Sequence, residues 1–353
     1  MPTNHERFMK AALREALRWT GCTSPNPVVG AVIVKGGRIL ARGAHERAGD
    51  PHAEVMALSA LRELSPEQQA RGATLYVTLE PCCTHGRTPP CTEAILNAGF
   101  ARVVIGALDP NPLHAGRAVR ILQAGGVEVV VGVLETDCFA ANRPFFKWIT
   151  TGRPWVIAKA GMSLDGRLTR PPGEGQWITG PAARRDAHRL RVRVDAILVG
   201  ANTLRIDNPS LTIRGVSVPA HKIQPWRVVL SRGASVLPEN AHLFTDEHKD
   251  RTLVYSGKPL GEVLDDLGAR GVNCLLVEGG GETLGAFFDA GLVDEVCFYM
   301  APLICGGPHS AVGGLGAADT EGAWKIAEPS YKKIGRDIRM TGLVARGAID
   351  VRS

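Results

Sequence analysis

Two short stretches in the first third of the chain contain the side chains best suited to metal chemistry. The sequence DPHAEV places His52 two residues before Glu54, and LEPCCTHGRTPPC supplies Cys82, Cys83 and Cys91. Histidine nitrogen and cysteine sulfur are ligands that zinc prefers, and a catalytic zinc site uses three protein ligands and keeps a fourth position for water. The residue types therefore indicate a catalytic zinc site.

The spacing leaves open which cysteine completes the site. The zinc-deaminase signature is H-x-E followed by P-C-x-x-C, and here the partner of Cys82 is either Cys83 or Cys91. Neighbouring side chains of an extended chain point apart, whereas Cys91 opens an expected helix whose dipole favours a thiolate. We predict His52, Cys82 and Cys91 as the ligands, with Cys83 outside the set.

Taken singly, these residues would fit a simpler interpretation, in which the histidine only starts a helix and the cysteines belong to the core. Their combination with Glu54 favours zinc. Glu54 would then act as the catalytic proton shuttle, taking a proton from an activated water and passing it to a ring nitrogen and to the leaving amine. The expected reaction converts an amino-pyrimidine into an oxo-pyrimidine with loss of ammonia.

Alternating strands and helices must position these residues. Hydrophobic spacing in the first half predicts helices over 7–20, 52–64, 90–100, 116–126 and 135–154. It predicts two strands joined by a Gly-Gly turn over 28–45, and further strands over 73–82, 101–110 and 127–133. The second half repeats the alternation, with strands over 155–162, 195–201, 226–231, 252–256, 274–280 and 294–304 and helices over 180–194 and 281–292. This order predicts an α/β fold with mostly parallel sheets and helices on both faces.

The length of 353 residues favours two domains, and we expect them at 1–150 and 153–353, with the boundary near Gly152. The net charge of +6 is divided evenly between the halves and aromatic residues make up only 5%, which argues against nucleic-acid binding. The start has no signal-peptide core and no apolar run is long enough for a membrane span. We therefore expect a cytoplasmic enzyme, whose eight cysteines are ligands or core residues rather than disulfides.

Several motifs resemble the bifunctional riboflavin-biosynthesis deaminase–reductase family over nearly the whole chain. In the first half these are SPNPVVGAVIV, GDPHAEVMAL, TLEPCCTHGRTPPC and DPNP; in the second half they are AKAGMSLDGRL, GEGQWITG, ILVGANTLRIDNPSLTIR and LLVEGGGETLGAFF. The resemblance implies a cytidine-deaminase-like zinc domain followed by a dihydrofolate-reductase-like domain. It further implies deamination of a diamino ribosylamino-pyrimidinone 5′-phosphate, followed by NADPH-dependent reduction of the ribosyl group to a ribityl chain.

The resemblance also assigns residues of the second half to the two ligands. The NADPH contacts that it implies are Gly161, Trp177, Thr203, Asp207, Ser231, Gly280, Gly281, Glu282, Thr283, Leu284, Gly285 and Ala286. The substrate contacts that it implies are Lys159, Gly175, Arg191, Leu211, Arg214 and Glu278. Arginine suits the substrate phosphate because its planar fork donates two parallel hydrogen bonds. A glycine turn at a helix start suits a pyrophosphate, although such turns are common without one.

The sequence leaves four alternatives open. The family usually has Ser-His after EPC, whereas this chain has Cys83 and Thr84 there. A histidine follows at His85, and it could take over the pyrimidine or phosphate contact of the family's histidine. The deaminase half could therefore be inactive or act on another amino-pyrimidine or on a nucleic-acid base. A zinc-stabilised binding module is a non-enzymatic alternative, but it would not require Glu54 or a second domain. We expect phosphorylated pyrimidines as partners, no nucleic acid or membrane, and a homo-oligomer.

Overall fold

The computed structural model describes residues 4–64, 70–85, 89–112, 114–168, 177–219, 221–233 and 236–346. Contacts divide the chain into two compact units. The first consists of Met1–Gly152 with Pro219–His221, and the second of Arg153–Val218 with Lys222–Ser353. Gly152 ends a helix with φ of 73°, in the left-handed conformation that glycine adopts most readily, so the chain leaves the first unit at this residue.

The first unit contains a five-stranded sheet in the order β2-β1-β3-β4-β5. Its strands are β1 (Gly30–Lys35), β2 (Arg38–Ala44), β3 (Thr74–Leu79), β4 (Arg102–Ala107) and β5 (Glu128–Val131). The predicted mostly parallel sheet is confirmed for four of these five strands: β3, β4 and β5 pair in parallel, and β2 runs in the same direction because both β2 and β3 pair antiparallel with β1. The strand β1 runs the other way. The tight turn at Gly36 and Gly37, both with positive φ, joins β1 and β2 as a hairpin.

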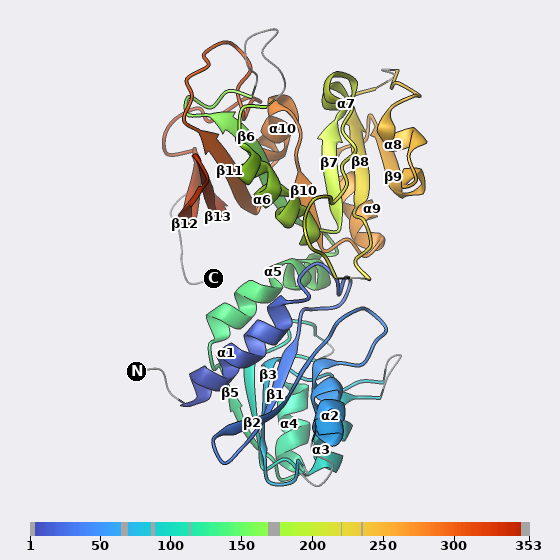
Figure 1. The fold of residues 1–353 in the computed structure, drawn as a ribbon, viewed down its shortest axis with the longest axis vertical. Helices are drawn as coiled ribbons and strands as arrows, with labels where there is room; N and C mark the ends of the chain where they lie inside the picture. The colour runs from blue at the N-terminus through green and yellow to red at the C-terminus, as the bar shows by residue number, and fades with distance from the viewer. Residues whose placement is uncertain are drawn as a thin grey trace. The chain divides into compact units, whose positions relative to one another are not determined.

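Five helices cover this sheet (Figure 1): α1 (Asn4–Leu17), α2 (Ala53–Leu64), α3 (Cys91–Ala98), α4 (Arg117–Ala124) and α5 (Glu135–Thr151). Alternate strand residues face opposite sides. Ile33 and Leu75 pack in one core with residues of α2, α3 and α4. Val32 and Tyr76 pack in the other core with residues of α1 and α5. The predicted layers of helices on both faces are therefore confirmed for this unit.

The second unit contains an eight-stranded sheet in the order β12-β13-β11-β6-β10-β7-β8-β9. Its strands are β6 (Trp155–Ser163), β7 (Ala196–Gly200), β8 (Trp226–Ser231), β9 (Thr252–Ser256), β10 (Cys274–Val277), β11 (Glu295–Ala301), β12 (Trp324–Ile334) and β13 (Asp337–Arg346). The strands from β11 to β9 in this order are parallel, as predicted. The antiparallel hairpin of β12 and β13 was not predicted and extends one edge.

Helices also cover both faces of the second sheet: α6 (Pro181–Val192), α7 (Ala201–Asp207), α8 (His242–Thr245), α9 (Leu260–Ala269) and α10 (Gly281–Asp289). Residues of α9 and α10 share one core with the sheet, and residues of α6, α7 and α8 share the other. A short 3-10 helix, η1 (Lys249–Arg251), precedes β9. The α/β fold class is thus confirmed for both units.

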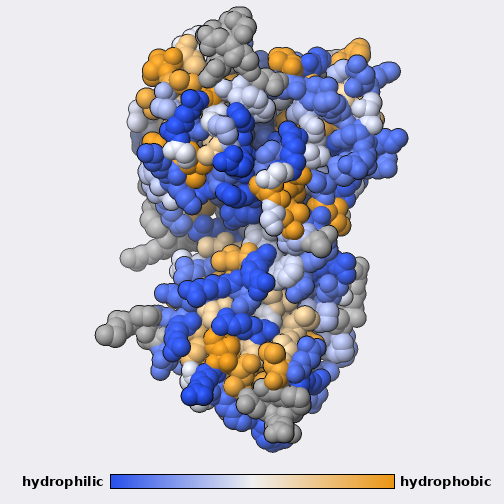
Figure 2. Space-filling view, in the orientation of Figure 1, coloured by the Kyte–Doolittle hydropathy of each residue, from blue (hydrophilic) through white to orange (hydrophobic). Residues whose placement is uncertain are grey.

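The surface is mixed in character. On the face shown in Figure 2, hydrophobic residues form separate patches among hydrophilic ones. Within the described residues, no helix has both the length and the apolar character needed to span a membrane.

Candidate metal centre and second site

Two helix starts and one strand end bring His52, Cys82 and Cys91 together. His52 immediately precedes α2, Cys82 follows β3, and Cys91 is the first residue of α3. Their ligand atoms all lie within 4.8 Å of one another. The Nδ1 atom of His52 lies 3.3 Å from Cys91 Sγ and 3.4 Å from Cys82 Sγ. One nitrogen and two sulfurs that converge in this way form the donor set of a zinc site with an open position.

The electrostatics of the cluster favour a thiolate at Cys82. Hydrogen bonding from the Cys91 thiol, with further contributions from His52 and the Cys91 backbone N–H, lowers the pKa of Cys82 to about 4, although burial opposes the shift. The Cys91 N–H donates to Cys82 Sγ over 3.3 Å, as expected at a helix N-terminus. The hydrogen bond with Cys82 in turn raises the pKa of His52. A site that stabilises a thiolate through its own dipoles fits a divalent cation.

Glu54 lies beside these ligands in the first turn of α2 and is buried, with 3% exposure. Its Oε2 atom has no hydrogen-bond partner among the described residues. Burial raises the pKa of Glu54, and the nearby His52 partly opposes this effect. A buried carboxylate oxygen without a partner is costly, so its presence here indicates a group that normally interacts with a ligand or water at the site.

A second carboxylate, Glu80, holds the loop that carries Cys82. Glu80 is buried, and its Oε2 atom accepts hydrogen bonds from the N–H groups of Asp109 at 3.3 Å and Gly116 at 2.9 Å. Its Oε1 atom accepts from Ala118 N–H at 3.0 Å. The carboxylate thus satisfies donors at the start of α4, where a negative charge is stabilising. Sequence reasoning did not single out Glu80, although its place directly after a buried strand was a usable signal.

The residues that depart from the family motif lie outside the ligand cluster. Cys83 Sγ lies 3.5 Å from His114 Nδ1 and is not part of the metal group, in line with the expectation that adjacent cysteines point apart. The ring of His85 is 74% exposed and its Nε2 atom lies 3.8 Å from Glu93. Cys83 therefore contacts a histidine of the segment before α4, His114, which the sequence did not suggest.

In the second unit, a buried carboxylate gathers several of the predicted substrate contacts. Glu278 follows β10 and accepts two hydrogen bonds from Arg191 of α6, at 2.8 Å to Oε1 and 3.0 Å to Oε2. Lys159 of β6 places its Nζ atom 3.6 Å from Oε2. The Glu278 side chain is only 8% exposed. Arg214 interacts electrostatically with both Arg191 and Glu278, and burial together with the Arg191 charge lowers its pKa.

The charges in this cluster do not balance. Burial disfavours ionisation of Glu278, but Arg191 and Lys159 outweigh it and hold the pKa of Glu278 well below its usual range. Three cations, Lys159, Arg191 and Arg214, therefore share one carboxylate. Burial, and then the charges of Arg191 and Arg214, lower the pKa of His188 in α6 to about 4, so this ring is neutral at pH 7. An excess of positive charge around a partly buried site favours an anionic ligand.

Asp165, in the turn after β6, accepts hydrogen bonds from three groups. Its Oδ1 atom accepts from Ser163 Oγ at 2.5 Å and from Cys305 N–H at 3.0 Å, and its Oδ2 atom accepts from Gly306 N–H at 2.7 Å. These bonds, the one from Ser163 first, lower the pKa of Asp165 to about 2. Asp165 therefore remains ionised at neutral pH and ties the turn after β6 to residues 305–306.

The predicted glycine-rich run has a packing role of its own. A Cβ atom on Gly281 would lie 2.1 Å from the carbonyl oxygen of Ser310, and one on Gly285 would lie 2.3 Å from Gly313. Both glycines therefore allow residues 310–314 to lie directly against α10. The N–H of Gly280 donates to Thr203 Oγ1 at 3.2 Å, which connects two of the predicted cofactor contacts. The remaining members, Glu282, Thr283, Leu284 and Ala286, form the first turns of α10.

Other predicted cofactor residues occupy several neighbouring elements. Gly161 lies in β6 and Ser231 ends β8, where its hydroxyl donates to the Gly233 carbonyl at 3.0 Å. Trp177 is 56% exposed and stacks beneath the Arg184 guanidinium, whose carbon lies 5.0 Å from the ring centre. Asp207 ends α7 and is exposed. Gly175, a predicted substrate contact, lies outside the described residues.

Comparison with known proteins gives one consistent result for both halves. The family model described as the cytidine and deoxycytidylate deaminase zinc-binding region matches residues 2–107, and the RibD C-terminal domain matches 154–339. Riboflavin biosynthesis protein RibD of Aquifex aeolicus is 40% identical over 94% of this chain and 96% of its own, and that of Escherichia coli is 39% identical over 96% of each.

Solved structures that resemble nearly the whole chain include the following two. Acinetobacter baumannii RibD, form 2, is 35% identical with a TM-score of 0.86 and covers 97% of this chain and 99% of its own. A Thermotoga maritima protein, named diaminohydroxyphosphoribosylaminopyrimidine deaminase/5-amino-6-(5-phosphoribosylamino)uracil reductase, is 34% identical with a TM-score of 0.85 and the same coverage.

Proposed function

The chain belongs to the RibD family of bifunctional riboflavin biosynthesis enzymes, and we propose that it carries out both reactions named for the Thermotoga relative. Residues 1–150 would deaminate the diaminohydroxyphosphoribosylaminopyrimidine. Residues 153–353 would reduce the resulting 5-amino-6-(5-phosphoribosylamino)uracil with NADPH, converting the ribosyl group to a ribityl chain. The two compact units support this division of labour.

For the deaminase, we assign His52, Cys82 and Cys91 as zinc ligands and Glu54 as the catalytic acid and base. Zinc, when bound, lowers the pKa of a water molecule toward neutrality. The unpartnered Oε2 of Glu54 is placed to accept the proton of that water. Its raised pKa suits the return of the proton to a ring nitrogen and then to the departing amine, because a shuttle works best when both protonation states are accessible.

For the reductase, we assign the cationic cluster around Glu278 to the phosphorylated substrate. The excess charge of Lys159, Arg191 and Arg214 supports binding of the phosphate, since arginine donates paired hydrogen bonds to such groups. Leu211 and Gly175 remain proposed as backbone contacts of the substrate. NADPH, when bound, supplies the hydride, and the chain holds and orients it.

We assign the cofactor to the strand ends and helix starts near α7 and α10. The proposed contacts are Gly161, Trp177, Thr203, Asp207, Ser231 and the run Gly280–Ala286. The hydrogen bond that joins Gly280 to Thr203 supports a shared role. Because a helix N-terminus leaves N–H groups without intrahelical partners, the start of α10 suits the pyrophosphate. The packing of Gly281 and Gly285 shows that these two glycines are also required without a cofactor.

The remaining features of the proposal concern partners and location. We propose small phosphorylated pyrimidines as the partners, without nucleic acid or membrane, and a homo-oligomer in the cytoplasm. The even charge distribution and low aromatic content support the first point. Sedimentation velocity at several protein concentrations would test the oligomeric state.

The observation that carries the proposal is that one chain holds two clusters. One is a His/Cys/Cys cluster beside the buried Glu54, whose Oε2 atom has no partner, and the other is a cation-rich cluster around the buried carboxylate of Glu278. A mass-spectrometric assay with the diamino substrate tests it. We expect a gain of one mass unit without NADPH, from replacement of NH2 by OH, and a further gain of two with NADPH. The Glu54→Gln variant should block the first change but still reduce the separately supplied deaminated compound. Reduction without any deamination by the unaltered protein would refute the first half of the proposal.

A further inference from the structure

The segment 208–214, which joins α7 to the region before β8, has an unusual backbone. Leu211 has φ of 48° and Asn208 has φ of 39°. Asparagine tolerates this left-handed region, but for leucine it is unfavourable. Leu211 is nevertheless 2% exposed. A residue in such a conformation persists only where surrounding contacts determine it, and such residues concentrate at ligand sites.

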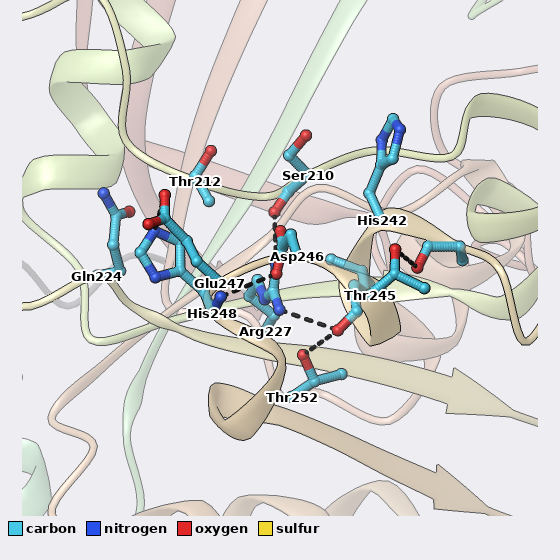
Figure 3. Close-up of polar contacts among 12 residues, drawn as sticks. Ser210, Thr212, Gln224, Arg227, His242, Thr245, Asp246, Glu247, His248 and Thr252 are labelled. Carbon is cyan, nitrogen blue, oxygen red and sulfur yellow. Dashed lines mark hydrogen bonds and ion pairs between the residues drawn. The ribbon is translucent and has the colours of Figure 1, made fainter.

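Arg227 of β8 supplies one of these contacts from inside the core. Its residue exposure is 0%, which makes it one of the largest fully buried side chains. Its Nη1 atom donates to the Ser210 carbonyl at 3.3 Å and to Asp246 Oδ2 at 2.5 Å, and its Nη2 atom donates to the Leu243 carbonyl at 2.9 Å (Figure 3). Arg227 therefore ties the residue before Leu211 to the segment around α8.

Gln224 and Arg191 fix the residues that follow Leu211. The Gln224 side chain binds both backbone groups of Ile213, accepting from its N–H at 2.7 Å and donating to its carbonyl at 3.2 Å. Arg191 Nη1 donates to the Thr212 carbonyl at 2.9 Å. Ser210, Thr212 and Ile213 thus each have a backbone group held from outside the segment. Arg214 comes next and carries one of the three charges near Glu278.

We propose that Arg227 and Gln224 are positioning residues for the reductase substrate. They hold segment 208–214 in the strained conformation in which the Leu211 backbone and the Arg214 side chain face the substrate. The inference rests on the proposed function, because it takes Arg214 as a phosphate contact. Burying an arginine costs more desolvation free energy than burying an apolar residue of similar size. The hydrogen bonds of Arg227 to the Ser210 carbonyl and to the α8 segment explain why an arginine occupies this core position.

Arg227 also anchors the α8 segment, and a matched variant separates the two roles. Thr252 Oγ1 donates to the same Leu243 carbonyl at 2.8 Å, which belongs to α8 and not to segment 208–214. Thr252→Val therefore weakens the α8 anchor alone. Arg227→Lys keeps the positive charge but loses the planar guanidinium group, whose two Nη atoms bind three acceptors. Gln224→Leu keeps the size of a half-buried side chain and loses both bonds to Ile213.

The experiment measures kcat and the KM values of the phosphorylated pyrimidine and NADPH in the full-length protein. Gln224→Leu and Arg227→Lys should raise the substrate KM about tenfold, the equivalent of one net hydrogen bond, while the NADPH KM and deaminase activity stay within about twofold. Thr252→Val should leave the substrate KM unchanged. In an Arg214→Ala background, the effect of Gln224→Leu should fall to about twofold or less, because both changes disable the same contact.

Two results would overturn the inference. One is an unchanged substrate KM in folded Gln224→Leu protein, which decides the matter even if Arg227→Lys fails to fold. The other is a full tenfold effect of Gln224→Leu in the Arg214→Ala background. If Arg214→Ala alone leaves the substrate KM unchanged, the phosphate assignment of the proposed function is wrong, and the inference that depends on it falls with it.

Discussion

Replacing Arg191 by alanine should destabilise the second unit more than a usual surface change would. Arg191 and Glu278 have side chains only 12% and 8% exposed, and they share two hydrogen bonds. A third bond joins Arg191 to the Thr212 carbonyl. The substitution removes all three and leaves the Glu278 carboxylate buried, with Lys159 at 3.6 Å and the charge of Arg214 as partial compensation.

The expected loss in the free energy of unfolding follows from the burial of the Arg191–Glu278 ion pair. Removing one partner of a buried ion pair costs about 3–5 kcal/mol, because the other charge is left without compensation. Lys159 and Arg214 retain part of the compensation, so we expect a value near the lower limit, about 3 kcal/mol. For a domain of this size, each kcal/mol lowers Tm by about 2–4 °C. The transition of the second unit should therefore fall by roughly 6–12 °C.

Differential scanning calorimetry of the full-length protein measures this shift. The matched variant combines Arg191→Met with Glu278→Leu, which removes both charges while keeping most of the volume. It should recover most of the lost stability, because apolar replacement of a buried pair is often neutral. A loss below about 1 kcal/mol in Arg191→Ala, or a double variant as unstable as the single one, would refute the assignment of the pair as a buried and coupled unit.

Three further predictions concern the two sites. Glu54→Gln should lower deamination by about 10²–10⁴-fold while atomic absorption still finds one zinc per chain; full turnover would exclude the shuttle role. Cys91→Ser should lose zinc and Cys83→Ser should keep it, and the reverse pattern would show that the ligand assignment is wrong. Because the pKa of Glu278 lies below its ordinary value of 4.5, its ionised form stabilises the fold above that pH, and this contribution is lost as the pH falls. The stability difference between the unaltered protein and Glu278→Gln, from urea unfolding, should thus shrink between pH 7 and pH 3; a constant difference would contradict the shift.

The parts of the fold that local patterns determine could be predicted from the sequence. The positions of His52 and Cys91 at helix starts follow from hydrophobic periodicity and from Pro90, which precedes α3. The turn at Gly36 and Gly37 is likewise a local signal. These features need only the residues on either side of them, so a single sequence is sufficient.

Features that depend on distant partners could not be predicted in the same way. The strand β1 pairs antiparallel with β3 across the intervening helix α2, and hydrophobic runs do not encode this direction. The bonds from Arg191 to Glu278 join residues 87 positions apart, and resemblance to a family suggested both residues as ligand contacts without revealing that they bind each other. The β12–β13 hairpin was missed because β12 is half-buried or exposed and lacks an apolar run.

The anchoring of Glu80 has a consequence for how the protein handles its metal. The loop with Cys82 is held by bonds from Glu80 to the start of α4, and these bonds use no atom of the proposed metal ligands. Small zinc modules whose only anchor is the metal unfold when it is removed. Here we expect the ligands to stay near their positions after zinc is removed, so that loading is a binding step rather than a folding step. Chelation should accordingly be reversible, with the circular dichroism spectrum unchanged and activity restored on adding zinc back.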